Sequence, residues 1–309
     1  MSTDEQRRLT RIRSNLERRA LIFQYTREFF REKGFLEVET PVRMPALAPE
    51  AQISPFRSEG WFLSTSPELH MKRLLAAGYD KLFQISRCFR KGERGRWHNP
   101  EFSLLEWYHA GADYLDMIRD TEELLLTLNK RLKLGGVISY QHQNICLTPP
   151  WTRITVREAF IAAAGWDPVA RCDSLRFDTD LLTRVMPSFP ADRPTVLLDY
   201  PASLASLARL KKGAPQVAER AEVFIGGLEL ANTFTELNDR HEQEKRFRQE
   251  RRLIQQQYHR RMPLPQRFIE AMTDLPECGG IALGMDRLVM LFCNADSIDE
   301  VMAFPSDTV

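Results

Sequence analysis

Long apolar segments are missing from this sequence. No run is long enough to cross a membrane, and the polar N-terminus has no signal-peptide pattern. The cysteines are scattered, and none forms a Cys-x-x-Cys pair or has a histidine cluster beside it. They stand at Cys88, Cys146, Cys172, Cys278 and Cys293. We therefore expect a cytoplasmic protein with reduced thiols, without a disulfide framework or a zinc site.

An excess of charge of either sign is missing too. The 309 residues include 43 Lys and Arg against 42 Asp and Glu, for a net charge of +1. This balance argues against a protein that coats nucleic acid through charge alone. Apolar residues make up 43% and charged residues 28%, which is ordinary for a globular protein. The length allows one large domain or two small ones with a sizeable core.

Hydrophobic periodicity predicts several helices. The first thirty-three residues have an apolar stripe typical of one helix, which Gly34 ends. The segment Phe35–Pro41 then predicts a strand that proline ends. A charged amphipathic helix is expected over 113–134, and a long polar helix over 240–262. We expect the buried side of the latter to hold Phe247, Ile254 and Tyr258.

The stretch from Cys88 to Tyr108 concentrates groups suited to ligand binding. Apolar runs at 82–85 and 102–105, joined by a glycine-containing loop, predict an antiparallel hairpin. Cations gather at its tip, and the return strand carries aromatic rings and carboxylates. Arginines hold phosphate oxygens and a carboxylate pairs with an ammonium, so the hairpin suits a nucleoside triphosphate beside an amine. Taken one at a time, these cations, aromatic rings and carboxylates are more commonly found in a solvated turn between ordinary strands than in a binding site.

Two later stretches are also rich in polar groups and glycine. Within residues 217–239, which predict a pair of strands, Glu229 and Glu236 lie seven residues apart. Two glutamates at this spacing are common by chance. The segment Cys278–Phe292 predicts a glycine-rich strand and turn that lead into a buried helix. Glycine there allows the backbone to approach a ligand closely.

Together these motifs resemble the class II aminoacyl-tRNA synthetases. The string RWHNPEFSLLEWY is similar to the second signature of that class in its lysyl version. Phe35–Pro41 resembles the first signature, and GMDRLVMLF resembles the third. The resemblance implies an α+β fold, the class II catalytic core with an antiparallel sheet flanked by helices. It further implies a single catalytic domain over 1–309 with a variable insertion at about 111–195, and a homodimer formed through the N-terminal helix and the Phe35–Pro41 strand.

The resemblance also implies ATP-dependent activation of an amino acid as its adenylate, with Mg²⁺. Arg90 and Arg287 would be the catalytic residues, and Glu229 and Glu236 would hold the metal. The nucleotide would be bound by Arg90, Lys91, Gly92, Glu93, His98, Asn99, Phe102, Glu229, Leu230, Gly284 and Arg287. The amino acid would be bound by Ser66, Pro67, Glu68, Glu106, Tyr108, Asn232, Glu236 and Ala282.

One position departs from the lysyl pattern. That pattern has Asn-Glu after the arginine, whereas this chain has Lys91-Gly92-Glu93. Either Glu93 or a backbone carbonyl would then contact the edge of adenine.

The acceptor of the activated amino acid is suggested by the N-terminal region. Only 34 residues precede Phe35, too few for the oligonucleotide-binding barrel of bacterial lysyl-tRNA synthetases, so we expect no anticodon-binding domain. The chain resembles free-standing paralogues that attach β-lysine to a lysine of elongation factor P. In those paralogues an alanine, here Ala282, replaces a pocket glycine.

Lysine or β-lysine and elongation factor P are therefore the expected substrates, without stable tRNA binding or membrane contact. The alternatives are a minimal ligase for tRNA or a small molecule, and a non-catalytic regulatory paralogue.

Overall fold

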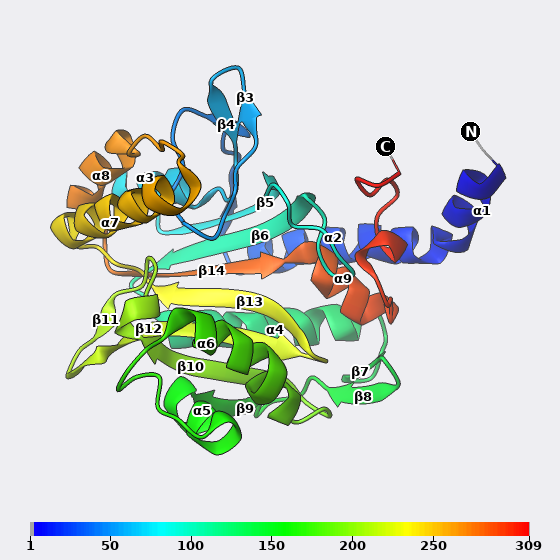
Figure 1. Ribbon diagram of the computed structural model, residues 1–309. Coiled ribbons are helices and arrows are strands. Elements are labelled where there is room, and N and C mark those ends of the chain that lie inside the picture. Colours follow the sequence, from blue (N-terminus) through cyan, green and yellow to red (C-terminus); the bar gives the residue numbers. More distant parts are fainter. Residues whose placement is uncertain (1–2, 309) are drawn as a thin grey trace. The chain divides into compact units, whose positions relative to one another are not determined.

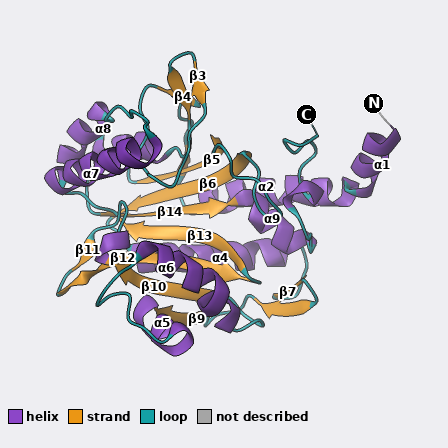
Figure 2. Cartoon of the chain, in the orientation of Figure 1, coloured by secondary structure: helices purple, strands orange, loops and turns teal. Residues whose placement is uncertain are grey.

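The computed structural model describes residues 3–308, which form two compact units. Of the described residues, unit 1 comprises 3–108, Asp239–Pro276 and 284–308, and unit 2 comprises His109–Asn238 and Glu277–Leu283. Each unit contains both helices and strands (Figures 1 and 2). The single catalytic domain expected over 1–309 stays a prediction.

The predicted N-terminal helix is two helices. Helix α1 (Thr3–Arg11) and helix α2 (Arg13–Glu32) are separated at Ile12, whose φ of −89° and ψ of 5° leave the helical range. The Ile12 side chain is buried, so packing overrides the continuous apolar stripe at this residue. The strand predicted over Phe35–Pro41 is correct only for β1 (Leu36–Glu37).

The predicted hairpin is confirmed and lies at the centre of unit 1. Strands β5 (Lys81–Phe89) and β6 (Glu101–Ala110) are neighbours, and β1 pairs with β5 in parallel. Phe30 of α2 packs on this sheet, with its ring stacked on Phe83 at 4.8 Å between centroids and tilted by 54° against Trp107 at 5.0 Å between centroids. Burial of these rings fixes α2 to the hairpin that carries nine of the nineteen predicted ligand-binding residues.

The other elements of unit 1 come before and after this hairpin along the chain, and they include a small sheet and several helices. A small sheet contains β2 (Arg43–Met44), β4 (Trp61–Leu63) and β3 (Arg57–Ser58). The helices are α3 (Glu68–Ala76), α7 (Arg240–Tyr258), α8 (Gln266–Ala271) and α9 (Met285–Cys293). In α7, Phe247 and Ile254 are buried as predicted. The prediction for Tyr258 is wrong, because the helix ends at this residue and its side chain is 48% exposed.

Unit 2 is built on a mainly antiparallel sheet. Its strand order is β14 (Cys278–Gly284), β13 (Leu228–Thr235), β12 (Ala214–Ile225), β10 (Thr195–Pro201) and β9 (Thr152–Thr155). Only the β9–β10 pair is parallel, and β11 (Leu210–Lys211) pairs with β12. The hairpin β7 (Val137–Tyr140) and β8 (Gln143–Cys146) stands apart from this sheet.

Helices flank both faces of the unit 2 sheet. Helix α4 (Tyr114–Arg131) packs on β12 and β13, and it begins at Asp113, whose side chain caps it. Helices α5 (Val156–Ala164) and α6 (Ser174–Asp180) cover the other face, where Phe160 and Phe177 pack with Leu197. Figure 1 shows α4 behind the strands and α6 in front of them. The predicted α+β fold, with an antiparallel sheet flanked by helices, is confirmed.

Gly279 shows how closely α4 approaches this sheet. A Cβ atom on Gly279 would lie 2.8 Å from the Asp113 carbonyl oxygen and 3.0 Å from Met117 Cγ. Because the carbonyl belongs to the start of α4, it cannot yield without moving the helix. Strand β14 therefore requires glycine at this position.

We expect Gly279→Ala to lower the free energy of unfolding by about 1–3 kcal/mol, the usual penalty of overpacking. Gly284→Ala is the matched control on the same strand, because its Cβ would lie at an ordinary 3.6 Å from the Arg287 side chain. Urea unfolding of both variants measures the difference. Equal stability of the two variants would contradict the close packing described here.

Candidate functional site

The first group of predicted residues is a set of cations at the tip of the hairpin in unit 1. Arg90 directly follows β5, and its backbone N–H donates to the Pro100 carbonyl at 2.9 Å. Its guanidinium lies 5.1 Å from the centroid of the Phe102 ring. Its Nε atom is buried and has no hydrogen-bond partner among residues 3–308. A buried guanidinium donor of this kind fits an anionic ligand such as a phosphate.

Arg287 is brought to the same region of unit 1. Its Nη2 atom lies 2.6 Å from Nε2 of His98. The preceding residue, Asp286, is 2% exposed, accepts a hydrogen bond from the Ser103 backbone at 2.7 Å and pairs with Arg19 at 2.7 Å. This buried anchor fixes the first turn of α9 to β6 and α2. The Asp286 contacts therefore also fix the backbone position of Arg287, the next residue.

The loop between β5 and β6 contains the position that departs from the lysyl pattern. Gly92 has a φ of +86°, a left-handed conformation that glycine adopts without strain. The Lys91 backbone N–H donates to the Ser54 carbonyl at 2.7 Å, and Glu93 pairs with Arg90 at 3.8 Å.

The Asn99 side chain hydrogen-bonds to backbone groups of the protein. Its Nδ2 donates to the Glu101 carbonyl at 2.5 Å, and its Oδ1 accepts from the Ser306 backbone at 3.0 Å. The amide is therefore engaged in fixing the loop.

The second group in unit 1 is a buried cluster around Glu106. This side chain is 1% exposed and points from β6. Its Oε1 accepts a hydrogen bond from Ser66 Oγ at 2.6 Å, and its Oε2 accepts one from Tyr108 Oη at 2.8 Å. Ser66 Oγ also accepts from the Glu68 backbone N–H at 3.0 Å, at the start of α3. The predicted amino-acid residues Ser66, Glu68, Glu106 and Tyr108 are thus neighbours.

Burial raises the pKa of Glu106 to about 7 from its ordinary 4.5, and the negative charge of Glu68 adds to this shift. The hydroxyls of Ser66 and Tyr108 and the charge of Lys72 lower it. A cationic ligand beside this buried carboxyl group would stabilise its ionised form.

Sequence reasoning missed Lys72, which belongs to this cluster. Its side chain is 1% exposed, and its Nζ lies 2.5 Å from Glu68 Oε1. The two residues are four apart on α3, so they share one helix face. Only the spacing was visible in the sequence. It gave no indication that the lysine was buried.

Two more predicted residues of unit 1 precede helices, Pro67 before α3 and Gly284 before α9. The other predicted residues belong to unit 2: Glu229, Leu230, Asn232, Glu236 and Ala282. In an ideal strand, residues seven apart point to opposite faces. Here Phe224 pairs with Glu229 and Val223 with Ala231, so β13 carries an extra residue. This bulge puts Glu229 and Glu236 on the same face of the sheet.

Asn232 and Ala282 share that face of unit 2. Asn232 pairs across the strands with Glu222 on one side and with Ala282 on the other. Its Oδ1 accepts from Arg220 Nε at 3.2 Å, and Arg220 Nη2 pairs with Glu222 at 2.7 Å. Leu230, in contrast, is 2% exposed and forms part of the hydrophobic interior.

Glu222 is a further residue that sequence reasoning missed. It is 6% exposed, and burial together with the negative charge of Glu229 raises its pKa to about 7. Arg220 lowers this pKa. Its position two residues after Arg220, in a strand of alternating pattern, was the available signal.

Among residues 3–308, no group of three or more His, Cys, Asp or Glu side chains could hold a metal ion. The donors that the face does offer are carboxylates. Carboxylate oxygens are the ligands that Mg²⁺ prefers, usually one or two of them completed by substrate phosphates. Glu222 and Glu229 are carboxylates of that kind on one face of the sheet, and the charge of Glu229 helps to raise the pKa of Glu222, although Glu222 also pairs with Arg220 at 2.7 Å.

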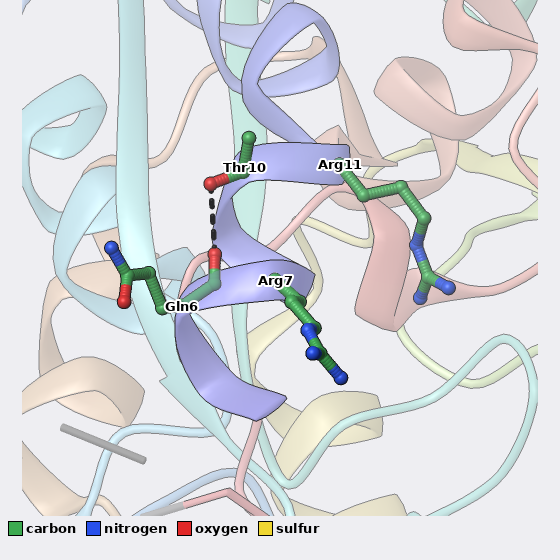
Figure 3. Close-up of a pocket in the computed structure, with 4 residues that line it drawn as sticks. All are labelled: Gln6, Arg7, Thr10 and Arg11. Carbon is green, nitrogen blue, oxygen red and sulfur yellow. Dashed lines mark hydrogen bonds between the residues drawn. The ribbon is translucent and has the colours of Figure 1, made fainter. Parts of the chain in front are cut away.

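A pocket on α1 contains none of the predicted site residues. It is lined by Gln6, Arg7, Thr10 and Arg11, and Thr10 Oγ1 donates to the Gln6 carbonyl at 2.8 Å (Figure 3). This bond lies within one helical turn, and all four lining residues belong to α1.

Strand β6 aligns the two groups of unit 1. Phe102, Glu106 and Tyr108 have the same parity along the strand and therefore share one face. Four residues of strand place Phe102 and Glu106 roughly 13 Å apart. The face thus holds an aromatic ring with a guanidinium at one end and an amine-seeking carboxylate at the other. It can bind a nucleotide and an amine side by side.

We expect the stability difference between Glu106→Gln and the wild type to depend on pH. The raised pKa means that the folded chain holds this proton more tightly than the unfolded chain, so the wild type loses stability as pH rises from 4.5 to about 7. The variant escapes this loss, and its relative stability should improve by as much as about 3 kcal/mol over that range.

Urea unfolding at a series of pH values measures the difference. Glu101→Gln is the control, because this carboxylate on the same strand is half exposed. A difference between Glu106→Gln and the wild type that stays constant with pH would contradict the burial argument.

Comparison with known proteins gives the family. The model of the class II tRNA synthetases (D, K and N) matches residues 5–308. The chain is 38% identical to an elongation factor P--(R)-beta-lysine ligase of Hamiltonella defensa, over 94% of this chain and 95% of the relative. It is 36% identical to the ligase of the same name from Sodalis glossinidius, over 94% of each chain.

A third relative, from Klebsiella pneumoniae, has the same name and is 38% identical over 95% of each chain. The predicted resemblance to ligases of elongation factor P is thereby confirmed. Among residues 3–308, no helix is long and apolar enough to span a membrane. With its hairpin, its arginines and its flanked antiparallel sheet, the chain belongs to the class II tRNA synthetase family (D, K and N).

Proposed function

We propose that this protein activates a lysine-like amino acid with ATP and transfers it to a lysine side chain of elongation factor P. The amino acid that we propose is (R)-β-lysine, the one in the name of the relatives. The observation that carries the proposal is the face of β6, where Phe102 with Arg90 and the buried Glu106 cluster stand on one strand.

The reaction has two steps. A carboxylate oxygen of the amino acid attacks the α-phosphorus of ATP, the bond to the bridging oxygen breaks, and pyrophosphate leaves. The ε-amine of the acceptor lysine then attacks the adenylate carbonyl, forming an amide and releasing AMP. Neither step needs a protein nucleophile, so positioning and charge stabilisation supply the rate.

The cations of unit 1 support the first step. Arg90 has a buried donor directed at no protein group in residues 3–308, which suits a phosphate oxygen. Arg287 and His98 lie together and suit the outer phosphates. One face of the Phe102 ring lies against Arg90, so adenine would stack on the ring beside this guanidinium.

Carboxylates of unit 2 would hold Mg²⁺, which neutralises phosphate charge when bound. The sequence predicts Glu229 and Glu236 for this role. The buried Glu222 is a further candidate, because the charge of Glu229 contributes to its raised pKa. We propose that Glu229 and Glu236 hold the metal and that Glu236, 2% exposed, also borders the amino acid.

Replacing Arg287 tests the activation step. We expect Arg287→Ala to reduce ATP–pyrophosphate exchange by at least about 100-fold, because a cation that acts on the transition state is lost. Arg96→Ala is the control, since Arg96 is exposed and bonds to Asp296. Undiminished exchange in Arg287→Ala would refute the assignment.

Ala282 tests the choice of amino acid. Its methyl group would crowd the α-ammonium of α-lysine, and a β-amino acid moves that ammonium one carbon away. One extra methyl in a tight site costs about 1–3 kcal/mol, or roughly ten- to a hundredfold in discrimination. We expect wild type to prefer β-lysine in pyrophosphate exchange and Ala282→Gly to shift toward α-lysine.

Ala231→Gly is the matched control for this test, because Ala231 is buried on the opposite face of the same sheet. It should leave the ratio of the two substrates unchanged. If wild type prefers α-lysine and Ala282→Gly keeps that preference, Ala282 is not the selecting residue.

We further propose a homodimer built on α2 and β1. Leu21 of α2 is 40% exposed, Leu36 of β1 is 50% exposed and Val42 is 47% exposed. Large apolar side chains that remain exposed on neighbouring segments are typical of an interface.

Light scattering should give twice the chain mass of 35.9 kDa. Leu36→Glu should shift the mass toward the monomer, whereas Leu175→Glu, at a residue of α6 that is 78% exposed, should not. A monomeric wild type with full activity would contradict the proposal.

A further inference from the structure

A buried lysine lies among the carboxylates that are proposed to receive the substrate amine. Lys72 is 1% exposed, and its ammonium contacts Glu68 Oε1 at 2.5 Å. The same ammonium lies 6.0 Å from the centre of the Tyr108 ring. An exposed pair at this helix spacing contributes little, but a buried ammonium persists only when the surrounding groups stabilise it. The position of Lys72 therefore calls for an explanation beyond helix stability.

The cluster around Lys72 has a simple charge balance. Two carboxylates, Glu68 and Glu106, face one ammonium, Lys72. Glu106 has its two oxygens hydrogen-bonded to the hydroxyls of Ser66 and Tyr108, which carry no charge. With both carboxylates ionised, one negative charge remains without a counter-ion inside the cluster.

Resting on the proposed activation of an amino acid, we propose that Lys72 is a positioning residue of the amino-acid site. It holds the Glu68 carboxylate from within the protein and leaves the cluster with one net negative charge, matched to one substrate ammonium. Without Lys72 the two carboxylates would repel each other across a buried space, and one of them would take up a proton.

The other polar groups near Glu106 add no charge to the cluster. Cys88 of β5 faces Glu106, but burial raises the pKa of its thiol to about 12, so it stays neutral. Ser66 and Tyr108 act on Glu106 only through hydrogen bonds that favour the ionised form. Glu68 and Lys72, both on α3, are therefore the groups whose charges set the state of Glu106.

The test compares Lys72→Met, which keeps the length and apolar stem, with Lys72→Arg, which keeps the charge. Pyrophosphate exchange is measured against amino-acid and ATP concentration over a pH series. In Lys72→Met we expect the acidic limb of kcat/KM for the amino acid to move up by about one pH unit or more, because the attraction that lowers the pKa of Glu106 is lost. KM for the amino acid should rise at neutral pH while KM for ATP stays unchanged, and Lys72→Arg should restore the wild-type limb.

A double variant separates charge from structure. Glu68→Gln combined with Lys72→Met removes the repulsion and the attraction together, so the limb should return toward its wild-type position. Arg248→Met is the matched control, since it breaks a largely exposed pair with Glu244 at the same helix spacing. It should not move the limb. A limb that stays in place in Lys72→Met, or KM values that rise alike for both substrates, would overturn the proposal.

An infrared titration keeps this test independent of activity. The band of the protonated Glu106 carboxyl, assigned with Glu106→Gln, should persist to higher pH in Lys72→Met than in wild type. An unchanged titration overturns the role of Lys72 even in an active enzyme. Absence of exchange in wild type with every amino acid, together with a shifted titration, would instead overturn the proposed function and retain the charge balance.

Discussion

A carboxylate that is almost fully removed from water must be stabilised by its surroundings, and Glu106 imposes this constraint on unit 1. Its two oxygens accept hydrogen bonds from Ser66 and Tyr108, and the paired charges of Glu68 and Lys72 stand beside it. These contacts join β6, the start of α3 and the segment before it. A substrate ammonium entering this cluster would neutralise the charge that remains, so binding energy and the choice of an amine come from the same groups.

The phosphate side of unit 1 depends on a second buried carboxylate. Asp286 joins α9 to β6 through the Ser103 backbone and to α2 through Arg19. Because Arg287 is the next residue, this anchor limits the motion of the guanidinium that lies against His98. Arginines held in advance can stabilise developing phosphate charge without reorganising during the reaction. The N-terminal helices thus contribute to the site through packing and ion pairs.

Local patterns predicted much of this fold, and tertiary packing decided the rest. The hairpin around Arg90 was predicted because apolar runs, turn residues and cations all occur between residues 82 and 108. The break at Ile12 was not, because the stripe of apolar residues continues through it. The burial of Lys72 depends on neighbours distant in sequence, so composition and spacing gave no signal of it, whereas for Glu222 the alternating pattern after Arg220 was the one available signal. The bulge in β13 likewise follows from pairing with β12, which the sequence of one strand does not encode.

Transfer to a protein acceptor distinguishes this protein from a tRNA synthetase, and intact-mass spectrometry of the acceptor measures that transfer. Elongation factor P is incubated with this protein, ATP, Mg²⁺ and (R)-β-lysine, and parallel reactions contain lysine tRNA or omit ATP. We predict that elongation factor P gains the mass of one lysyl residue on a single lysine, only with ATP, while the tRNA remains uncharged. Unmodified elongation factor P in the presence of charged tRNA, or no transfer to either acceptor despite active pyrophosphate exchange, would contradict this prediction.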